Sequence, residues 1–557
     1  MSATLPAAYK NRKTPGVYIT ELDAFPKSIV GVQTAVPAFI GYTEQATANG
    51  QSLLLKPIAI SSMADFEQIF GYEYNQLYDI DLIKPSSPPK PSNPDFSIDT
   101  DGFLVVPTNG QPQFNLYYSM RLFYANGGSN CYVVSVGYYE SNGSLNKVQR
   151  SDLEAGLNAI SYQVGPTMLV VPDAVLLPSD GSTSSSDFPG SDIPLSTDFN
   201  TFTQKMLEQA WKLQDRVALF DIYGTLSVTQ ENVDFDLDAC VDEFQTAIQQ
   251  AQVTDPSYGV AYFPFLKTSI VQSSDINYTN FNPNQKPEEG ASSPAPNTQL
   301  KEILTMFNQQ MYLNDSKTQT TVQTAIDKID QSSPHGSTDV ITQNNLLANA
   351  LPQYGQLLAT VAQKAGVLPP SAAMAGLYTF NDQTRGVWNA PANLSVLSTV
   401  ALSVDLNDAQ QGGLNVPING YAIDVVRNFV GRGPVVWGGR TLNGNSQDWR
   451  YIQVRRTIIY IEQSIKIAIN QFVFAANVAS TWVAVTQMIS GFLQNLWSQG
   501  GLMGDKASDA FTVLCGMPDT MTATDILNGY MVVQVTLQMV HPAEFIELTF
   551  KQQMQSS

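Results

Sequence analysis

The sequence predicts a mixed α/β fold, with α+β character, spread over several domains. Apolar strand patterns and amphipathic helix patterns alternate through the middle of the chain. The strand patterns cover residues 131–136, 167–172, 216–222 and 259–266, and the helix patterns cover residues 153–160, 202–213 and 241–251. Near-continuous apolar strands that alternate with helices are typical of a sheet covered by helices. The 557 residues leave room for roughly three or four units of about 150 residues.

Composition and charge exclude several classes of function. The chain has 29 basic and 49 acidic residues, a net charge of −20, and only 14% of its residues are charged, against about 25% in an average soluble domain. An acidic chain lacks the cationic surface of a general nucleic-acid binder, so we expect no nucleic-acid partner. Because His335 and His541 are the only histidines, a three-histidine metal site is impossible. A large, weakly charged, acidic chain also suggests that copies of itself cover much of its surface.

Sequence motifs for catalysis or cofactor binding are absent. The chain has no GxxxxGK[ST], HExxH or GxSxG pattern, so we expect no enzyme, no cofactor and no metal site. The three cysteines form no CxxC pair, which favours a reducing compartment. The first residues lack the apolar core of a signal peptide, so assembly in the cytoplasm is expected. Asparagines and glutamines interrupt the apolar stretch 467–496, and we therefore expect no direct membrane insertion.

The two ends of the chain each carry a strand pattern without a nearby partner. In the C-terminal third, helix patterns at 449–474 and 481–497 precede alternating strands at 531–540 and 546–550. A similar short alternating strand lies at 15–22, behind a polar leader. A lone strand is unstable, so two alternatives are open. Each terminal strand either folds back onto its own chain or adds to the sheet edge of a neighbouring subunit.

A series of short blocks rich in Gly and Pro runs through nearly the whole chain. The blocks are TPGVYITELDAFPKSIVGVQTAVPAFIGY at 14–42, DFEQIFG at 65–71, RLFYANGG at 121–128, CYVV at 131–134, VVPDA at 170–174, LPPSAAMAG at 368–376, RGVWNAPAN at 385–393, LN at 414–415, WGGRTL at 437–442, WRYIQVRR at 449–456 and PAEFI at 542–546. In this order the blocks resemble the contractile tail sheath proteins of phages and related injection systems. Residues 474–479 lack the proline that the family usually has between its last two helices, and residues 270–350 carry no block.

The resemblance implies a structural function. It implies a subunit that polymerises helically around an inner tube and contracts to drive the tube through a target envelope. The implied partners are the chain itself in a homopolymer with six-fold rings, the inner tube protein, and baseplate and terminator or cap proteins. The implied location is a phage tail or an injection-system particle. The alternatives are a static self-assembling shell or surface-layer protein and, remotely, an α/β enzyme with a crevice at its strand ends.

The resemblance also implies a domain plan in which terminal strands are exchanged between subunits. An inner, tube-proximal domain would join residues 1–40 to residues 346–557, and residues 41–345 would form an outer inserted α/β domain with Pro- and Ser-rich surface loops. The exchanged arms would be Val17, Tyr18, Ile19, Thr20, Glu21 and Leu22 at one end and Phe545, Ile546, Glu547, Leu548, Thr549 and Phe550 at the other.

A basic segment stands out within the acidic chain. Residues 424–466 hold seven basic and three acidic residues, a net charge of +4. We hypothesise that Arg455, Arg456 and Lys466 contact an acidic inner tube. The alternative is that the arginines of this segment pair with acidic groups between sheath subunits. Exposed ion pairs of either kind are weak, about 0–1 kcal/mol each, and therefore releasable.

Overall fold

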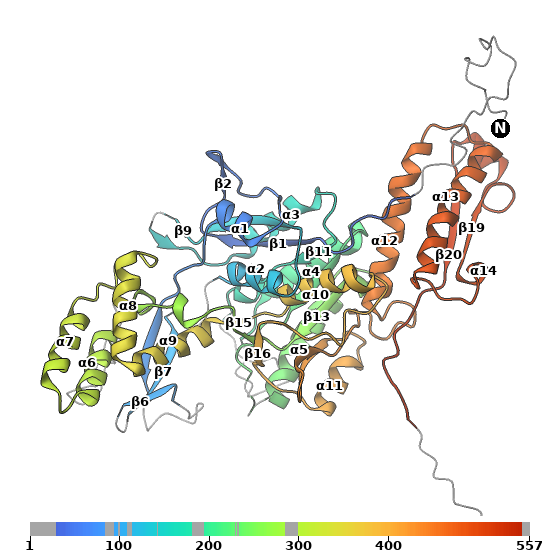
Figure 1. Ribbon diagram of the computed structural model, residues 1–557. Coiled ribbons are helices and arrows are strands. Elements are labelled where there is room, and N and C mark those ends of the chain that lie inside the picture. The colour runs from blue at the N-terminus through green and yellow to red at the C-terminus, as the bar shows by residue number, and fades with distance from the viewer. Residues whose placement is uncertain are drawn as a thin grey trace, which may run out of the picture. The chain divides into compact units, whose positions relative to one another are not determined.

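The computed structural model divides the chain into two compact units (Figure 1). The larger unit comprises residues 35–380 and 391–452, and the smaller comprises residues 1–34, 381–390 and 453–557. The residues that the structure describes are 29–83, 94–98, 101–108, 114–141, 143–180, 194–228, 230, 233–283 and 299–548. The predicted strand Val17–Leu22, the residues Thr549 and Phe550, and most of the Pro- and Ser-rich loops lie outside them.

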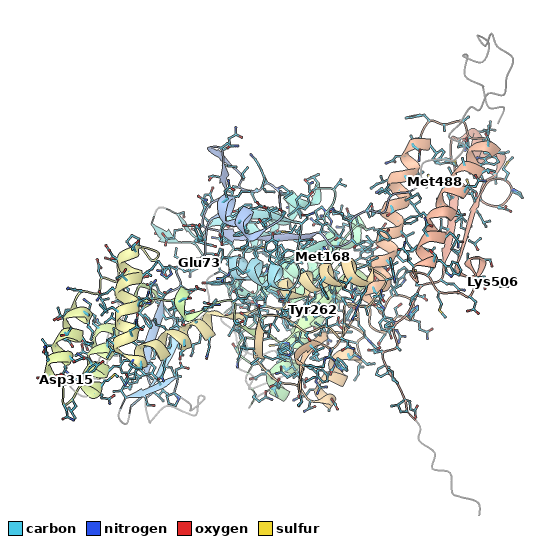
Figure 2. All side chains as sticks on the ribbon, viewed as in Figure 1. Glu73, Met168, Tyr262, Asp315, Met488 and Lys506 are labelled. Atoms are coloured by element: carbon cyan, nitrogen blue, oxygen red, sulfur yellow. The ribbon has the colours of Figure 1, made fainter. Side chains whose placement is uncertain are left out.

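An eight-stranded sheet forms the centre of the larger unit. Its strands are β1 (Pro37–Thr43), β4 (Ile58–Ile60), β8 (Cys131–Tyr138), β11 (Met168–Val170), β12 (Val217–Asp221), β13 (Gly259–Phe263), β17 (Asp424–Phe429) and β18 (Gly433–Val436). They lie in the order β18-β17-β13-β12-β11-β1-β8-β4, with parallel pairing except at the two edge strands. Met168 and Tyr262 lie among the packed side chains of this sheet (Figure 2). The prediction of a mixed α/β fold is confirmed.

Helices cover both faces of this sheet. They are α2 (Leu116–Ala125), α3 (Arg150–Ser161), α4 (Thr197–Leu213), α5 (Val233–Gln250) and α10 (Ser371–Arg385). On β1, Phe39 packs against Phe123 of α2, with ring centroids 5.1 Å apart. The next residue, Ile40, faces α3, where a Cβ atom added to Gly156 would lie 2.6 Å from Ile40. Because successive strand residues point to opposite faces, α2 and α3 cover opposite sides of the sheet.

A helical layer over a small sheet forms a second part of the larger unit. The sheet has the order β5-β7-β6 and consists of β5 (Tyr78–Leu82), β6 (Phe96–Ile98) and β7 (Asp101–Pro107), and the helices are α6 (Leu300–Met311), α7 (Ser316–Asp327), α8 (Thr338–Ala350) and α9 (Pro352–Ala365). Phe103, Val105, Leu304, Phe307 and Tyr354 are buried in its core. Most of the segment that carries no family block therefore folds into this layer.

The remaining elements of the larger unit are short. They are β2 (Thr47–Ala48), β3 (Gln51–Ser52), α1 (Met63–Phe70), β9 (Glu140–Ser141), β10 (Ser144–Leu145), β14 (Leu266–Thr268), β15 (Val367–Leu368), β16 (Thr399–Leu402) and α11 (Asp408–Asn415). The predicted domain boundary after residue 345 does not coincide with a boundary between the two units. The reason is that residues 424–436 supply β17 and β18, which complete the central sheet beside β13.

The smaller unit packs two long helices and a β-hairpin together. The helices are α12 (Ile452–Ile469) and α13 (Ala479–Ser498), with the short helices α14 (Ala507–Ala510) and α15 (Ala523–Leu527), and the hairpin strands are β19 (Phe511–Cys515) and β20 (Val533–Leu537). Ile461 of α12 is buried in one core with Val485, Ile489 and Leu493 of α13. These elements correspond to the predicted helices and to the predicted strand at 531–540.

Candidate functional site

The strand ends of the central sheet hold buried carboxylates that cap helices. Asp173, just beyond β11, accepts hydrogen bonds from the backbone N–H groups of Tyr42 at 2.9 Å and Asn115 at 2.6 Å, and Asn115 is the N-cap of α2. Asp221, the last residue of β12, accepts bonds from the N–H and the hydroxyl of Ser371, at the start of α10, at 2.8 and 2.5 Å. Burial raises the pKa of Asp173 to about 6 and that of Asp221 to about 7.

This arrangement bears on the enzyme alternative. In open α/β sheets, ligands bind outside the carboxyl ends of the strands, and helix N-termini there attract anions. In this chain the carboxylates of Asp173 and Asp221 occupy such positions at the starts of α2 and α10. Both acids are bonded to the protein's own backbone, so the geometry assigns them to helix capping rather than to bond chemistry.

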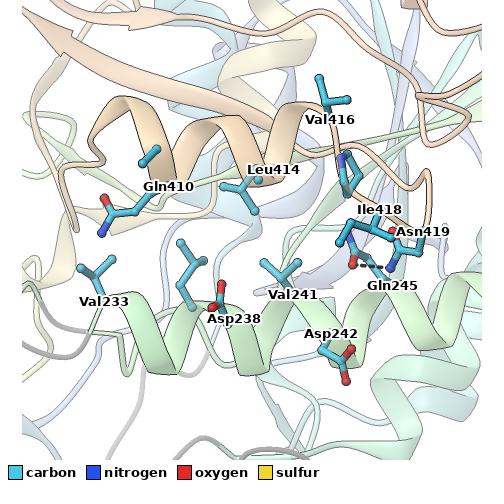
Figure 3. Close-up of a pocket in the computed structure, with 14 residues that line it drawn as sticks. Val233, Asp238, Val241, Asp242, Gln245, Gln410, Leu414, Val416, Ile418 and Asn419 are labelled. Carbon is cyan, nitrogen blue, oxygen red and sulfur yellow. Dashed lines mark hydrogen bonds between the residues drawn. The ribbon is translucent and has the colours of Figure 1, made fainter.

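A groove of about 620 Å³ lies between α5 and α11. Figure 3 shows Val241 of α5 and Leu414 of α11 on its walls, with Asp238 and Asp242 also from α5. A hydrogen bond of 2.6 Å between the side-chain amides of Asn419 and Gln245 closes one end. The lining contains no His, Cys or Lys, so the groove has no general base beyond its aspartates. Elsewhere in the described chain, no group of three or more His, Cys, Asp or Glu side chains is arranged to hold a metal ion.

The hairpin of the smaller unit is a sheet of only two strands. Phe511 pairs with Leu537 and Cys515 with Val533 in an antiparallel register, and β19 also contacts α13. Over the residues that the structure describes, neither strand pairs with a third one. Unpaired strand edges present rows of N–H and C=O groups to any extended chain, and a two-stranded sheet is by itself only marginally stable. The hairpin is therefore suited to accept further strands.

The C-terminal residues that follow this hairpin expose large apolar side chains. Residues 541–548 form no helix or strand. Phe545, Ile546 and Leu548 are 76%, 77% and 74% exposed. This is the described portion of the predicted arm Phe545–Phe550, and it has no strand partner within the described chain. A run of exposed apolar residues of this kind is typical of protein interaction sites.

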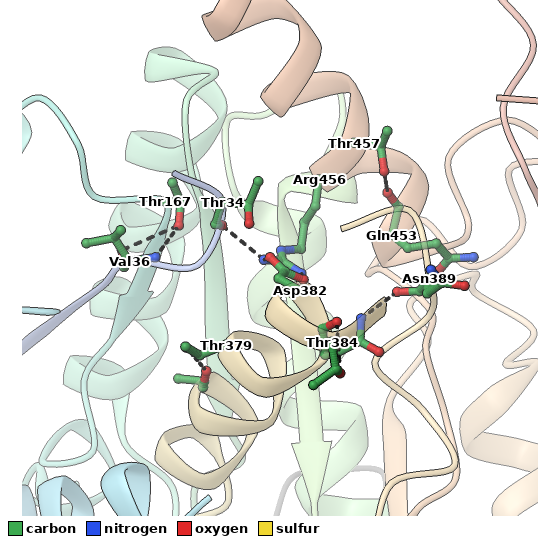
Figure 4. Close-up of polar contacts among 12 residues, drawn as sticks. Thr34, Val36, Thr167, Thr379, Asp382, Thr384, Asn389, Gln453, Arg456 and Thr457 are labelled. Atoms are coloured by element: carbon green, nitrogen blue, oxygen red, sulfur yellow. Dashed lines mark hydrogen bonds and ion pairs between the residues drawn. The ribbon is translucent and has the colours of Figure 1, made fainter. Parts of the chain in front are cut away.

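The structure places two of the three predicted tube-facing residues inside the smaller unit. Arg455 and Arg456 are only 3% and 4% exposed. The Arg456 guanidinium forms a two-pronged ion pair with Asp382, at 3.0 and 2.6 Å, and also donates a hydrogen bond of 3.0 Å to the carbonyl of Thr34 (Figure 4). The hypothesis of a tube contact is therefore not supported for Arg455 and Arg456, because neither side chain reaches the surface. Lys466 is exposed and stays a candidate.

Comparisons with known sequences point to sheath proteins. Residues 445–553 match the family model of the phage tail sheath C-terminal domain. A putative prophage major tail sheath protein of Pseudomonas aeruginosa strain UCBPP-PA14 is 26% identical over 180 residues, 32% of this chain and 44% of that protein. The tail sheath protein of Vibrio phage KVP40 is 25% identical over 186 residues, 33% of this chain and 26% of that protein. The matched region thus spans less than half the length of these curated relatives.

Comparisons with solved structures extend the similarity to almost the whole chain. The sheath complex of PVC, an extracellular contractile injection system, in its contracted state is 25% identical with a TM-score of 0.53, covering 97% of this chain and 98% of that one. The contracted helical sheath of the anti-feeding prophage shares the fold at 24% identity and a TM-score of 0.54, covering 97% and 100%. The resemblance to contractile sheath proteins is confirmed, and these relatives are structural proteins rather than enzymes. Among the described residues, no helix is long and apolar enough to cross a membrane.

Proposed function

We propose that the chain is a structural subunit of a contractile tail sheath, which polymerises helically around an inner tube and contracts to drive the tube through a target envelope. The observation that carries the proposal is the similarity to the contracted PVC sheath over 97% of the chain. The buried, backbone-bonded carboxylates at the strand ends agree with a protein that does no bond chemistry.

The proposed assembly uses strand exchange between subunits. The segments Val17–Leu22 and Phe545–Phe550 of neighbouring copies add to the two free edges of the β19–β20 hairpin. Two observations support this: the hairpin has no third strand in the described chain, and the apolar side chains of Phe545, Ile546 and Leu548 are exposed. Strand addition satisfies backbone groups across chains while alternate side chains provide specificity.

The proposed polymer is an open helix with two arrangements, a metastable extended one and a more stable contracted one. A contact between different surfaces of identical subunits, repeated by rotation and rise, generates a filament rather than a closed dimer. Rigid subunits joined by strand arms can then move between an extended and a contracted packing, which is a bistable interface. The work on the tube would be the sum of small gains over many subunits, without nucleotide hydrolysis.

The proposed orientation follows from the terminal segments. We assign the smaller unit, which holds both chain ends and lies mainly within the sheath-domain match at 445–553, to the tube side. The larger unit then projects outward. The proposed partners are the inner tube, with Lys466 as the candidate contact, the baseplate, and a terminator or cap protein.

Electron microscopy of the full-length chain produced with its inner tube protein tests the proposal. We expect striated tubes of two lengths, extended and contracted. Sheets or tubes of one fixed length would instead support a static shell, and particles that never polymerise would refute both.

Deletion of residues 1–22 should leave a folded subunit that forms no contractile sheath. Deletion of residues 551–557, which lie beyond the proposed C-terminal arm, is the matched control and should leave assembly intact.

A further inference from the structure

We infer that residues 29–34 form an anchor that fastens the N-terminal arm to one face of helix α12 and carries the tension between subunits. The role in tension rests on the proposed function, in which residues 17–22 are bound to a neighbour. The anchor itself rests on contacts within the smaller unit and can be measured in the free subunit. We call residues 29–34 the arm anchor.

The arm anchor runs along a single stripe of α12. The Thr34 carbonyl accepts a hydrogen bond of 3.0 Å from Arg456. The Val32 N–H donates a bond of 3.1 Å to the hydroxyl of Ser464. The three helix positions that contact the anchor, Arg456, Tyr460 and Ser464, are four residues apart and therefore share one helix face. Because residue 34 meets residue 456 and residue 32 meets residue 464, the anchor runs antiparallel to the helix.

The contact with Tyr460 requires a glycine in the anchor. A Cβ atom added to Gly31 would lie 2.2 Å from the Tyr460 hydroxyl oxygen and about 3 Å from two of its ring carbons. The Tyr460 ring lies beside Phe492 of α13, with centroids 5.9 Å apart, which limits the directions in which the ring can withdraw. Close approach of the backbone to a rigid side chain is one of the few uses that only glycine can serve.

The first residue of the arm anchor, Ile29, is buried in the core of the smaller unit. Ile29 is buried together with Ile461 of α12 and with Val485 and Ile489 of α13. By contrast, Val30 is 82% exposed and Gln33 is also exposed, so these two side chains point to solvent. Hydrogen bonds at residues 32 and 34 and a buried side chain at residue 29 therefore fix the segment at three points.

A buried ion pair holds Arg456, the side chain that binds the anchor at Thr34. Arg456 binds both carboxylate oxygens of Asp382, which belongs to α10 and to the same unit. The guanidinium that holds the Thr34 carbonyl is thus itself immobilised, because two parallel N–H bonds to a carboxylate fix its plane.

The spacing between the anchor and the proposed strand determines where tension acts. Six residues, 23–28, separate Leu22 from Ile29, and fully extended they span about 20 Å. A neighbour that holds residues 17–22 and rotates away during contraction will therefore pull directly on Ile29.

The test compares substitutions on the two sides of the anchor. Gly31→Ala places a methyl group against Tyr460, and Ser464→Ala removes the acceptor of the Val32 N–H. Gln33→Ala, on the exposed side, is the matched control. Hydrogen exchange of the Val32 amide in the free, folded subunit should accelerate by about tenfold in the first two variants and stay unchanged in the control. Unchanged exchange in Gly31→Ala and in Ser464→Ala would overturn the anchor, whatever the sheath does.

The second readout is the contracted sheath. We expect Gly31→Ala subunits to assemble into extended sheaths that fragment when contraction is triggered, whereas Gln33→Ala sheaths contract whole. Accelerated Val32 exchange together with intact contraction would overturn the role in tension. The deletion of residues 1–22 separates this outcome from a failure of strand exchange. If sheaths of that deletion contract normally, the arm proposal fails, while the exchange of Val32 still reports on the anchor.

Discussion

At the scale of single residues, the buried ion pair of Arg456 and Asp382 is an interaction whose loss should weaken the smaller unit. Both side chains are less than 5% exposed, and the pair joins α12 to the end of α10. Asp382→Asn would leave the guanidinium buried without its counter-charge, and such a loss costs about 3–5 kcal/mol. We expect a decrease of this size in the free energy of opening of α12, measured by native-state hydrogen exchange.

An exposed ion pair provides the control for this prediction. Arg427 and Asp408 are 2.6 Å apart, but the Asp408 side chain is 95% exposed. Asp408→Asn should change the free energy of unfolding by less than about 1 kcal/mol, because water screens exposed pairs. Equal effects of Asp382→Asn and Asp408→Asn would contradict the assignment of Arg456 to a buried structural role.

The carboxylate at the end of β12 predicts a dependence of stability on pH. Burial raises the pKa of Asp221 to about 7 in the folded state, from an ordinary value of 3.8. Between these two values the folded protein holds a proton that the unfolded chain has released. The free energy of unfolding should therefore fall as the pH rises from about 4 to about 7, by up to about 1.4 kcal/mol per pH unit. Asp221→Asn retains the shape without the titration, so its melting temperature should vary less over this range; an unchanged pH profile would contradict the prediction.

These residue contacts mark the limit of what the sequence predicts. The charge excess of residues 424–466 indicated a binding role for Arg455 and Arg456, but their burial depends on the packing of α12. The partner Asp382 lies 74 residues away from Arg456, and no local pattern connects the two. The family block 449–456 marks the segment as special without distinguishing a surface contact from a buried ion pair.

At the scale of elements, the hairpin edges give a sharp test of strand exchange. The Gln538 N–H donates to the Ala510 carbonyl across the hairpin at 2.8 Å. Because N–H groups alternate in direction along a strand, the Val535 N–H points to the free edge of β20. Val535→Pro removes this donor and leaves the β19–β20 pairing in place. We expect folded subunits that fail to form sheaths in electron micrographs.

The control for Val535→Pro is a second substitution at the same position, Val535→Ala. Val535 is part of the packing around α13, so Val535→Pro also removes some apolar contact. Val535→Ala removes a similar contact but keeps the N–H, and it should still assemble. If Val535→Pro subunits form normal contractile sheaths, no strand is added at the β20 edge.

The elements themselves were predictable to different degrees. The parallel strands β8, β11, β12 and β13 are near-continuous apolar runs, and such runs identify buried strands without further information. The placement of β17 and β18 in the same sheet depends on pairing with β13, more than 160 residues away in sequence, which explains why the predicted boundary at residue 346 differs from the observed units. Of the hairpin strands, only β20 was predicted, from the alternating pattern at 531–540, and β19 was not; the strands predicted to lack partners were those at 15–22 and 546–550.

At the scale of the whole molecule, net charge should oppose the proposed polymerisation. Each subunit carries a net charge of −20, and like-charged subunits packed together repel one another. Several basic groups are already satisfied within the chain. Arg456 binds Asp382, Arg427 binds Asp408, and Arg432 donates to Asn393. Two of the seven cations of the 424–466 segment, Arg427 and Arg456, are therefore already in ion pairs within the subunit, which reduces the number available for the alternative use, ion pairs between subunits.

This balance predicts that salt promotes assembly. Raising the ionic strength from about 0.01 M to about 0.1 M shortens the screening length from about 30 Å to about 10 Å, which weakens repulsion between subunits while strand pairing and apolar contacts persist. The critical concentration for sheath formation, measured by sedimentation, should therefore fall as salt increases over this range. Lys466→Ala removes one of the exposed cations, so if repulsion dominates it should raise the critical concentration slightly at low salt and have no effect at high salt. A critical concentration that rises with salt would mean that ion pairs between subunits outweigh repulsion, and the cohesion of the sheath would then be electrostatic rather than based on exchanged strands.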